Sequence, residues 1–374
     1  MICTRERYAR VPELFSLFYD SQEAALSHKY VDTIVADGDG TVYGPPVYGS
    51  SIVRLPQLNE SPTYAPIIGW IRSGQVEDSF TRLFILITGN ELQRTKQRFV
   101  KHIPKDARRA VVYVANGGAV LYYHDIKGKR YEDLNYRMNA LAGGTTFPAE
   151  LAEKVIETGL SFINKFYKQF SEDERLRGEV QQKDPAKYAT ILSKSQEHPH
   201  PFVREELITQ DASQLPRIEV RTLDDVAITQ ITLYGVPYFY DTENADLQAL
   251  KDVHAARVNF SIEINLKGVD KQLALKYLGI NPHRSLALGD RPKENDKPLT
   301  TYSVMPFISV SREESMVPQD LMPLHIGKNM QGSATLIQAL LDEDLTPGTK
   351  DSVIQTRLHT IVKQIQCAAA GVLK

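Results

Sequence analysis

The sequence has 374 residues and only two cysteines, Cys3 and Cys367, which stand near opposite ends of the chain. Two cysteines are too few for a disulfide scaffold or for a structural zinc site built on cysteine. The small count fits a reducing compartment. The length suggests two domains, or one large domain with an insertion.

The sequence also lacks a bias of charge. It carries 44 Lys and Arg against 46 Asp and Glu, for a formal net charge of −2. A sum so close to zero gives no reason to expect a nucleic-acid partner or an anionic membrane partner. Hydrophobic residues make up 42% and charged residues 24% of the chain. These are the proportions of a globular protein, and they exclude wholesale disorder.

Long hydrophobic runs are missing as well. No stretch approaches the roughly 20 apolar residues that a membrane-spanning helix needs. Near the N-terminus the apolar residues are interrupted by Glu13, Ser16 and Asp20, so the uninterrupted apolar core of a secretory signal is absent. We therefore expect a cytoplasmic protein, with export by a route independent of such signals left open.

Short apolar runs bounded by turn residues are what the sequence does contain. Their hydrophobicity is continuous, the pattern of strands covered on both faces in a parallel α/β sheet. The runs are Val31–Ala36, Leu83–Ile87, Val111–Ala115, Ser285–Leu288 and Pro306–Val310, with a weaker one at Leu324–Ile326. We predict the α/β class, with a parallel-sheet core.

The middle of the chain has a different character, which predicts an inserted α+β domain over 120–260. It would begin near position 120, within a predicted hairpin, Val111–Tyr123, whose turn is Asn116-Gly117-Gly118. We expect a helix over 148–170, a polar proline-bearing segment over 171–201, strands over 230–240 and 256–266, and a helix over 246–254 between those strands. The remaining chain would comprise an N-terminal extension (1–30), a discontinuous core (31–119 and 261–345) and a C-terminal helix (346–374).

Chemically useful side chains follow three of the predicted strands directly, and ligands of open α/β sheets bind at such carboxyl ends. The first set is Asp37-Gly38-Asp39-Gly40-Thr41. Two carboxylates at positions i and i+2 of an extended segment point the same way, so they need a cation or a proton between them. Mg²⁺ suits such hard oxygen ligands. The alternative is an ordinary turn between strands.

Two further segments could hold a phosphate. Thr88-Gly89-Asn90 offers a hydroxyl and backbone N–H groups between a strand and a helix, although the same residues suit a plain helix N-cap. Lys271 stands at a predicted helix start behind Asp270, where it would supply a fixed cation. Lys267 and Lys276 compete for that role, and a solvated lysine is the alternative.

A third strand end carries more carboxylates. Gly289-Asp290 follows the run Ser285–Leu288, and Asn295-Asp296 closes the loop after it. Carboxylates that arrive from another strand end could complete a Mg²⁺ site, and a polar loop is the alternative.

The four segments, VADGDGT, LITGN, GVDKQLAL and LALGDRPKEND, resemble in order and context the four motifs of the haloacid dehalogenase-like phosphohydrolase superfamily. The insert between the second and third motifs, the NGGAV turn and the approach EINLKGVDKQLALKYLGI resemble the Cof-type, sugar-phosphatase-like branch. The resemblance implies a Rossmann-like core with an α/β cap of the C2 type acting as a lid.

The resemblance also implies roles for individual residues. Asp37 would be the nucleophile, Asp39 the general acid and base, and Thr88 and Lys271 the groups that hold the phosphoryl oxygens. Mg²⁺ would be the cofactor, bound by Asp37, by the backbone carbonyl of Asp39, by Asp290 and by Asp296. The remaining substrate- and phosphate-binding positions would be Gly40, Thr41, Gly89, Asn90 and Asn295.

Three positions depart from the motifs. Position 38 is glycine where a bulky apolar residue is commoner, and Gln272 stands where glycine is usual. Asp296 lies six residues after Asp290, whereas four or five is the usual spacing, so Glu294 rivals it as the last acid. We favour Asp296, because an Asn-Asp pair is the usual ending. Residues 42–80 form a longer loop than usual, to which we assign no role.

The function implied is hydrolysis of a small phosphorylated metabolite, such as a sugar phosphate. A phosphotransferase or phosphomutase with the same chemistry, and a non-catalytic binding module that retains the fold, stay open as alternatives. Substrate identity and oligomeric state stay open too. The residues of the insert that could select a substrate are Arg204, Arg217, Arg221, His198 and His200.

Overall fold

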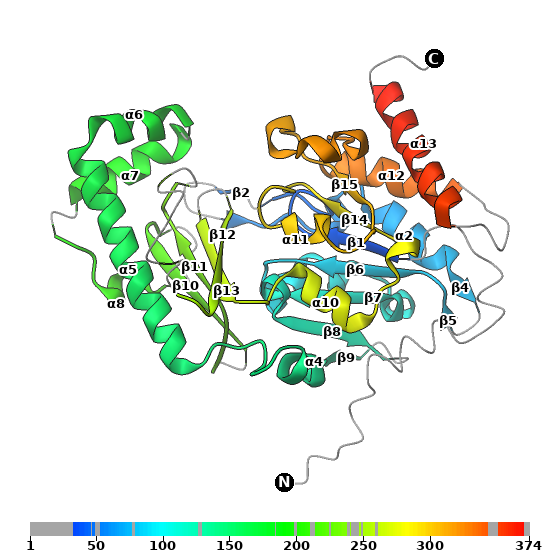
Figure 1. Ribbon diagram of the computed structural model, residues 1–374, viewed down its shortest axis with the longest axis horizontal. Coiled ribbons are helices and arrows are strands. Elements are labelled where there is room, and N and C mark those ends of the chain that lie inside the picture. Colours follow the sequence, from blue (N-terminus) through cyan, green and yellow to red (C-terminus); the bar gives the residue numbers. More distant parts are fainter. Residues whose placement is uncertain are drawn as a thin grey trace, which may run out of the picture. The chain divides into compact units, whose positions relative to one another are not determined.

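A computed structural model of the chain (Figure 1) describes residues 33–45, 47–48, 53–76, 79–125, 129–183, 185–197, 200–209, 214–223, 226–237, 240, 247, 250–258, 261–342 and 351–369. These residues form two compact units. The first comprises the described residues within 1–47, 54–144 and 270–374, and the second those within 48–53 and 145–269. None of the described helices combines the length and the apolar character needed to cross a membrane.

A seven-stranded sheet forms the centre of the first unit (Figure 1), in the order β15-β14-β1-β6-β7-β8-β9. Every residue of β1 and β6 is buried, which explains why their sequences are continuously apolar. The parallel strands are β1 (Thr33–Asp37), β6 (Leu83–Ile87), β7 (Val111–Ala115), β14 (Ser285–Gly289) and β15 (Phe307–Ser309), and β8 (Val120–His124) and β9 (Arg130–Glu132) extend them in antiparallel fashion. The predicted α/β class with a parallel-sheet core is confirmed.

Helices cover this sheet, and α2 and α12 pack against each other. Trp70 and Ile71 of α2 are among the buried side chains. The helices are α2 (Tyr64–Ser73), α3 (Leu92–Arg98), α4 (Leu134–Asn139), α10 (Lys271–Leu278), α11 (Lys297–Thr300), α12 (Met330–Asp342) and α13 (Asp351–Ala369), with short turns η3 (Leu58–Glu60), η4 (Val100–His102), η5 (Lys105–Ala110), η6 (Asn116–Gly118), η7 (Pro282–Arg284), η8 (Glu314–Met316) and η9 (Gln319–Leu324). Two small ribbons pair β2 (Val47–Tyr48) with β3 (Val53–Arg54), and β4 (Gln75–Val76) with β5 (Ser79–Phe80).

The second unit is a four-stranded antiparallel sheet with helices on one face. Its order is β10-β11-β13-β12, and the long helix α5 (Ala149–Glu172) packs against β11, where Gly159 approaches the Leu233 side chain. The strands are β10 (Arg217–Leu223), β11 (Ala227–Tyr234), β12 (Val253–Val258) and β13 (Ser261–Leu266), and the other helices are α6 (Glu174–Lys183), α7 (Pro185–Glu197) and α8 (Arg204–Leu207). This is the α+β architecture expected for the insert.

The two faces of that sheet differ in chemistry because side chains alternate along each strand. Ile218, Ile231 and Ile264 belong to the core that α5 covers. Along β10, Arg217, Glu219 and Arg221 alternate with Ile218 and Val220 and lie on the other face. One face of the sheet therefore builds the apolar core, and the other carries polar and charged groups.

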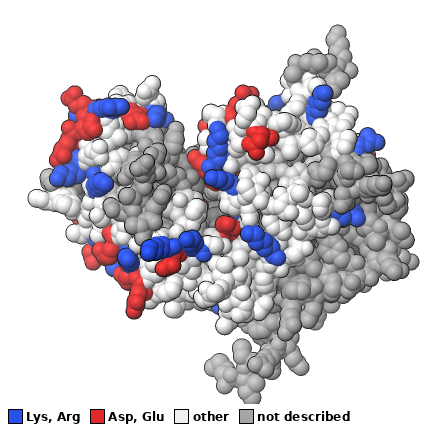
Figure 2. Space-filling view, viewed as in Figure 1, with Lys and Arg blue, Asp and Glu red and all other residues white. Residues whose placement is uncertain are grey.

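Charged side chains of both signs occur together on the surface. On the face drawn in Figure 2, acidic and basic residues are interspersed over α6 and α7. The i,i+4 pair of Lys183 and Glu179 on α6, with 2.5 Å between Nζ and Oε1, is an example. Over these helices, therefore, positive and negative side chains lie close together.

The limits of the compact units differ from the predicted domain boundaries at both ends of the insert. Residues 120–144, predicted to belong to it, lie in the first unit because β8 pairs with β7 and β9 pairs with β8. Residues 261–269, predicted to belong to the core, lie in the second unit because β13 pairs with β11 and β12. In each case strand pairing decides the membership.

Four local predictions also need correction. The weak run Leu324–Ile326 is no strand, and His325 makes only an isolated bridge to Ser309. The predicted strand over 256–266 is in fact the end of β12 followed by β13, and the predicted strand over 230–240 ends at Tyr234. The polar segment over 171–201 contains α6 and α7. Most of the predicted helix over 246–254 and all of the extension over 1–30 lie outside the described residues.

Candidate active site

The first carboxylate, Asp37, is the last residue of β1 and lies at the carboxyl edge of the parallel sheet. A tight turn follows, in which Val42 N donates to Gly38 O and Gly40 N donates to Tyr43 O, both at 2.9 Å. Gly40 has φ +78°, and a Cβ built on it would lie 2.2 Å from Asp290 Oδ2. Glycine at position 40 therefore permits both the turn and the close approach of Asp290.

Three of the predicted carboxylates converge at this edge. Asp37, Asp290 and Asp296 each offer an oxygen, and these oxygens lie within 4.8 Å of one another. Lys271 Nζ lies 2.5 Å from Asp37 Oδ1 and 2.6 Å from Asp296 Oδ1. Asp296 is fully buried, and its Oδ2 accepts a hydrogen bond from Arg291 N at 2.9 Å. The structure thus brings together residues that are up to 259 positions apart, from Asp37 to Asp296.

Glu294, the rival of Asp296, lies elsewhere. Its Oε2 accepts a hydrogen bond from Arg291 Nη1 at 2.9 Å. Glu294 is not part of the carboxylate group that forms among the described residues. The loop after Asp290 therefore turns Asp296, and not Glu294, toward Lys271.

The electrostatics of the group show that it holds too much negative charge. Burial raises the pKa of Asp37 well above its usual range, Asp296 and Asp290 raise it further, and Lys271 opposes them. Burial and the neighbouring Asp296 raise the pKa of Asp290 to about 7. Although burial alone lowers the pKa of Lys271, the two carboxylates outweigh it and raise that pKa. Three carboxylates thus surround one ammonium, which is the kind of site that a divalent cation balances.

Lys271 is placed by the start of α10. The side chain of Asp270 caps this helix by accepting from Gln272 N at 2.7 Å and from Leu273 N at 3.0 Å. A Cβ on Gly118 would lie 2.3 Å from the carbonyl oxygen of Asp270, so the Asn-Gly-Gly turn packs directly on the helix start. Lys271 is 3% exposed, whereas its sequence competitors Lys267 and Lys276 are exposed.

The Thr88 loop is fastened to the neighbouring strand. Thr88 N donates to Val114 O at 2.9 Å, and Thr88 O accepts from Gly117 N at 3.1 Å. The buried Thr88 hydroxyl accepts hydrogen bonds from Asn90 N at 3.1 Å and from Asn90 Nδ2 at 3.0 Å. The loop therefore has a fixed conformation next to β1.

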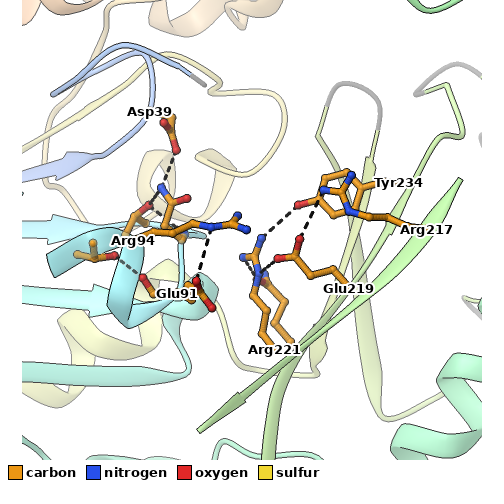
Figure 3. A network of polar contacts seen from close by, with 11 residues as sticks. Asp39, Glu91, Arg94, Arg217, Glu219, Arg221 and Tyr234 are labelled. Atoms are coloured by element: carbon orange, nitrogen blue, oxygen red, sulfur yellow. Dashed lines mark hydrogen bonds and ion pairs between the residues drawn. The ribbon is translucent and has the colours of Figure 1, made fainter. Parts of the chain in front are cut away.

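The side chain of Asp39 does not join the other carboxylates. Its Oδ2 accepts from Asn90 Nδ2 at 2.7 Å, the contact drawn at Asp39 in Figure 3, and its Oδ1 lies 2.6 Å from Arg98 Nη1. The predicted metal contact through the backbone carbonyl of Asp39 stays a prediction. Arg98, at the end of α3, was not identified from the sequence, because it belongs to none of the four motifs.

The remaining predicted positions lie in the turn after Asp37, in the Thr88 loop and in the loop before Asp296, and Gly89 and Asn295 are only partly buried. Thr41 is fully buried, and neither its Oγ1 nor Asn295 Oδ1 has a hydrogen-bond partner among the described residues. Gly89 lies between Thr88 and Asn90 in the fastened loop. The phosphate-binding roles of these residues stay predictions.

A second polar cluster lies on the charged sheet face of the second unit (Figure 3). Arg221 Nε donates to Glu219 Oε1 at 2.7 Å, and Arg217 Nη2 lies 3.5 Å from Glu219 Oε2. Arg221 Nη2 donates to Tyr234 Oη at 3.2 Å, and the Arg217 guanidinium stacks on the Tyr234 ring at 3.7 Å. Arg221 also donates to Gln230.

Two of the five residues considered for substrate selection thus share one face of β10. Arg204 instead pairs with Glu153 of α5, with 2.9 Å between Nη2 and Oε1, on the helical side of the unit. His200 is exposed, and His198 lies outside the described residues. Arg217 and Arg221 are therefore the two candidates that the fold gathers into one cluster.

No protein-family model matches the chain, and no curated protein is significantly similar to it in sequence. Among solved structures, it is similar to an N-terminally truncated, IMP-bound IMP-nucleotidase from Plasmodium falciparum, with 10% identity and a TM-score of 0.46 over 84% of this chain and 68% of that one. It is also similar to an Aspergillus fumigatus trehalose-6-phosphate phosphatase, with 11% identity and a TM-score of 0.42 over 86% and 98%. A third similar structure is a haloacid dehalogenase-like hydrolase from B. subtilis, with 13% identity and a TM-score of 0.45 over 82% of this chain and 99% of that one.

Proposed function

We propose that the chain is a Mg²⁺-dependent phosphomonoester hydrolase that acts on a small phosphorylated metabolite, such as a sugar phosphate, through an aspartyl-phosphate on Asp37. The observation that carries the proposal is the convergence of Asp37, Asp290 and Asp296 on Lys271 at the carboxyl edge of a parallel sheet. Open α/β sheets bind their ligands at this edge.

The carboxylate group fits a hard divalent cation. Its donors are all oxygens, and Asp290 Oδ1 is buried without a hydrogen-bond partner among the described residues. We propose that Asp37, Asp290 and Asp296 hold Mg²⁺, with the backbone carbonyl of Asp39. When bound, the ion would supply positive charge that reduces the repulsion between an anionic nucleophile and an anionic phosphate.

The residues of the chain would divide the chemistry into two displacements. In the first, a carboxylate oxygen of Asp37 forms a bond to phosphorus while the bond to the leaving oxygen breaks, and Asp39 gives a proton to that oxygen. In the second, Asp39 takes a proton from water as the water oxygen bonds to phosphorus and Asp37 is released. Lys271 would neutralise the phosphoryl charge in both steps, with the Thr88 hydroxyl holding a phosphoryl oxygen.

We assign the second unit the role of the substrate-selecting cap that the resemblance implies. Its insertion between the second and third motifs supports this role. The role concerns selection alone, because the residues of the proposed chemistry all belong to the first unit.

The test is hydrolysis of p-nitrophenyl phosphate by the purified chain with and without Mg²⁺. We expect Mg²⁺-dependent release of inorganic phosphate, and its loss in Asp37→Asn. Asp106→Asn is a matched control, since Asp106 is an exposed aspartate of the same unit that lies before β7, at the opposite edge of the sheet. Full activity in Asp37→Asn would overturn the proposal. Release of p-nitrophenol only with an added acceptor hydroxyl, and without inorganic phosphate, would indicate a phosphotransferase.

A further inference from the structure

A buried arginine, Arg98, contacts the acid and base that we propose. It is the last residue of α3, is 1% exposed, and places Nη1 2.6 Å from Asp39 Oδ1. None of the four sequence motifs contains it. Burying a guanidinium costs free energy unless its charge is paired and its N–H groups have acceptors. The contacts of Arg98 therefore show what its burial serves.

Arg98 is fixed on three further sides. Its Nε donates to Pro56 O at 3.0 Å, and its Nη2 donates to Gly44 O at 2.6 Å. Its guanidinium stacks on the ring of Tyr43, 4.1 Å from the centroid. A planar group held at these points has one orientation, in which Nη1 forms an ion pair with Asp39 Oδ1.

The unusual glycine of the first motif belongs to the same arrangement. A Cβ on Gly38 would lie 2.5 Å from Tyr43 Oη and 3.0 Å from Thr88 Oγ1. The absence of a side chain at position 38 thus makes room for the Tyr43 ring. That ring, fully buried, carries Arg98. Gly38, which departs from the motif, and Arg98, which lies outside it, therefore both pack against Tyr43.

The other oxygen of Asp39 is held as well. Asn90 Nδ2 donates to Oδ2 at 2.7 Å while Arg98 Nη1 lies against Oδ1. The side chain of Asp39 is nevertheless 33% exposed, so a reacting group can reach it. A carboxyl group with both oxygens engaged has a defined position and rotation, which proton transfer in a transition state requires.

We propose that Arg98 is a positioning residue that sets the location of the Asp39 carboxyl group for proton transfer. The inference rests on the proposed function and adds to it a residue that no motif contains. A purely structural Arg98 would only tie Gly44 and Pro56 to α3, and its loss would affect all substrates alike.

The basicity of the leaving group distinguishes a positioning role of Arg98 from a purely structural one. Protonation of the departing oxygen matters more as that oxygen becomes more basic, so misplacing the acid slows poor leaving groups most. We therefore propose measuring kcat/KM over a series of substituted phenyl phosphates, from p-nitrophenyl to unsubstituted phenyl. Because kcat/KM reports the steps up to release of the leaving group, it excludes hydrolysis of the aspartyl-phosphate.

We expect Arg98→Met to steepen the dependence of kcat/KM on leaving-group basicity, as Asp39→Asn should. At the phenyl end of the series, the loss should reach the order of 100-fold, the effect of misplacing a catalytic group by about 1 Å. Arg98→Lys keeps the charge and should recover part of the loss. In the Asp39→Asn background, Arg98→Met should add little, because the two residues act as a unit.

The chain offers a matched control in Arg82. Arg82 is also buried in the first unit, its guanidinium stacks on the Trp70 ring at 4.3 Å, and it donates to the Ser73 hydroxyl. Arg82→Met therefore removes a buried arginine from an aromatic ring without touching Asp39. We expect it to shift kcat/KM equally across the series. An equal shift in Arg98→Met as well would overturn the inference.

A structure determination keeps the test independent of turnover and of the proposed function. In Arg98→Met, the Asp39 carboxyl group should leave its position against Asn90, and in Arg82→Met it should stay. An unchanged Asp39 in folded Arg98→Met would overturn the inference. Activity that survives Asp37→Asn would instead overturn the proposed function and leave this structural result standing.

Discussion

Each compact unit buries a cluster of charged side chains, and the two clusters differ in how their charges balance. At the edge of the first sheet, three carboxylates surround Lys271, and the nearby Arg291 is already paired with Glu294. On the sheet of the second unit, the buried carboxylate of Glu219 lies between two guanidinium groups, and Glu263 adds a second negative charge near Arg221.

The difference shows which of the two clusters is electrically neutral. Two arginines and two glutamates neutralise one another, so the second cluster can stay ionised without help. The first has an excess of about two negative charges, and burial together with this excess raises the pKa values of Asp37 and Asp290. We infer that the first cluster is built to bind a cation and the second to hold its own shape.

The largest effect should come from removing the ammonium group of Lys271 from the first cluster. Lys271→Met deletes the ammonium that touches Asp37 and Asp296, and it also removes the charge that would stabilise the phosphoryl group. We expect kcat with p-nitrophenyl phosphate to fall by about 10³-fold, the upper range for loss of one electrostatic contact to a transition state. Lys276→Met, an exposed lysine on the same helix, should leave kcat unchanged. Equal activity of the two variants would contradict the comparison.

A somewhat smaller effect should follow from changing one of the carboxylates. Asp296→Asn removes an oxygen charge from the group, whereas Glu294→Gln breaks only the pair with Arg291. Titration calorimetry with Mg²⁺ should show a loss of affinity on the order of 100-fold or more for Asp296→Asn, since even outer partners of a metal contribute 10- to 100-fold. Glu294→Gln should change the affinity only slightly. The reverse order would return Glu294 to the metal site.

The sequence alone predicts the parallel strands and most of the residues at their carboxyl ends. Strands β1, β6 and β7 could be located from their continuous apolar runs, because burial on both faces leaves no room for polar residues. Asp37, Thr88 and Asp290 follow such runs directly, so strand order brings them to one edge. The choice between Asp296 and Glu294 depended instead on the path of a loop, and only the structure decides which side chain turns toward Lys271.

What the sequence could not predict depends on distant pairing. The two limits of the insert are set by the pairing of β8 with β7 and of β13 with β11. The local sequence of neither strand identifies the strand with which it pairs. Arg98 and Tyr43 are 55 residues apart, and nothing in their local sequence links either to Asp39. Gly38 is a signal in the sequence, because a glycine where the motif commonly has a bulky apolar residue leaves space that another side chain can fill, and Tyr43 lies there.

The balanced cluster should respond to mutation in stability and not in chemistry. Glu219→Gln leaves two buried guanidinium groups with one carboxylate fewer. Breaking a buried ion pair from one side costs about 3–5 kcal/mol, so urea unfolding should show a loss of that order for the second unit. Hydrolysis of p-nitrophenyl phosphate should persist in the folded fraction. Glu153→Gln, which breaks the exposed pair with Arg204, should leave the unfolding transition unchanged. Equal destabilisation by both variants would contradict the difference in burial.

The smallest effect concerns protons in the first cluster of the metal-free protein. Between pH 3.8, the ordinary pKa of an aspartate, and about 7, the folded chain keeps a proton on Asp290 that the unfolded chain loses. The free energy of unfolding therefore falls as the pH rises through this window, because the folded state binds more protons there. With EDTA present, the Tm of the wild type relative to Asp290→Asn should therefore drop between pH 4 and pH 7, by roughly 2–4 °C for each kcal/mol of stability that is lost. At pH 7, added Mg²⁺ should raise the Tm of the wild type more than that of Asp290→Asn, because a ligand that binds only the folded state stabilises it. A Tm difference that stays constant with pH would show that the excess negative charge is balanced within the chain, and the contrast between the two clusters would then fail.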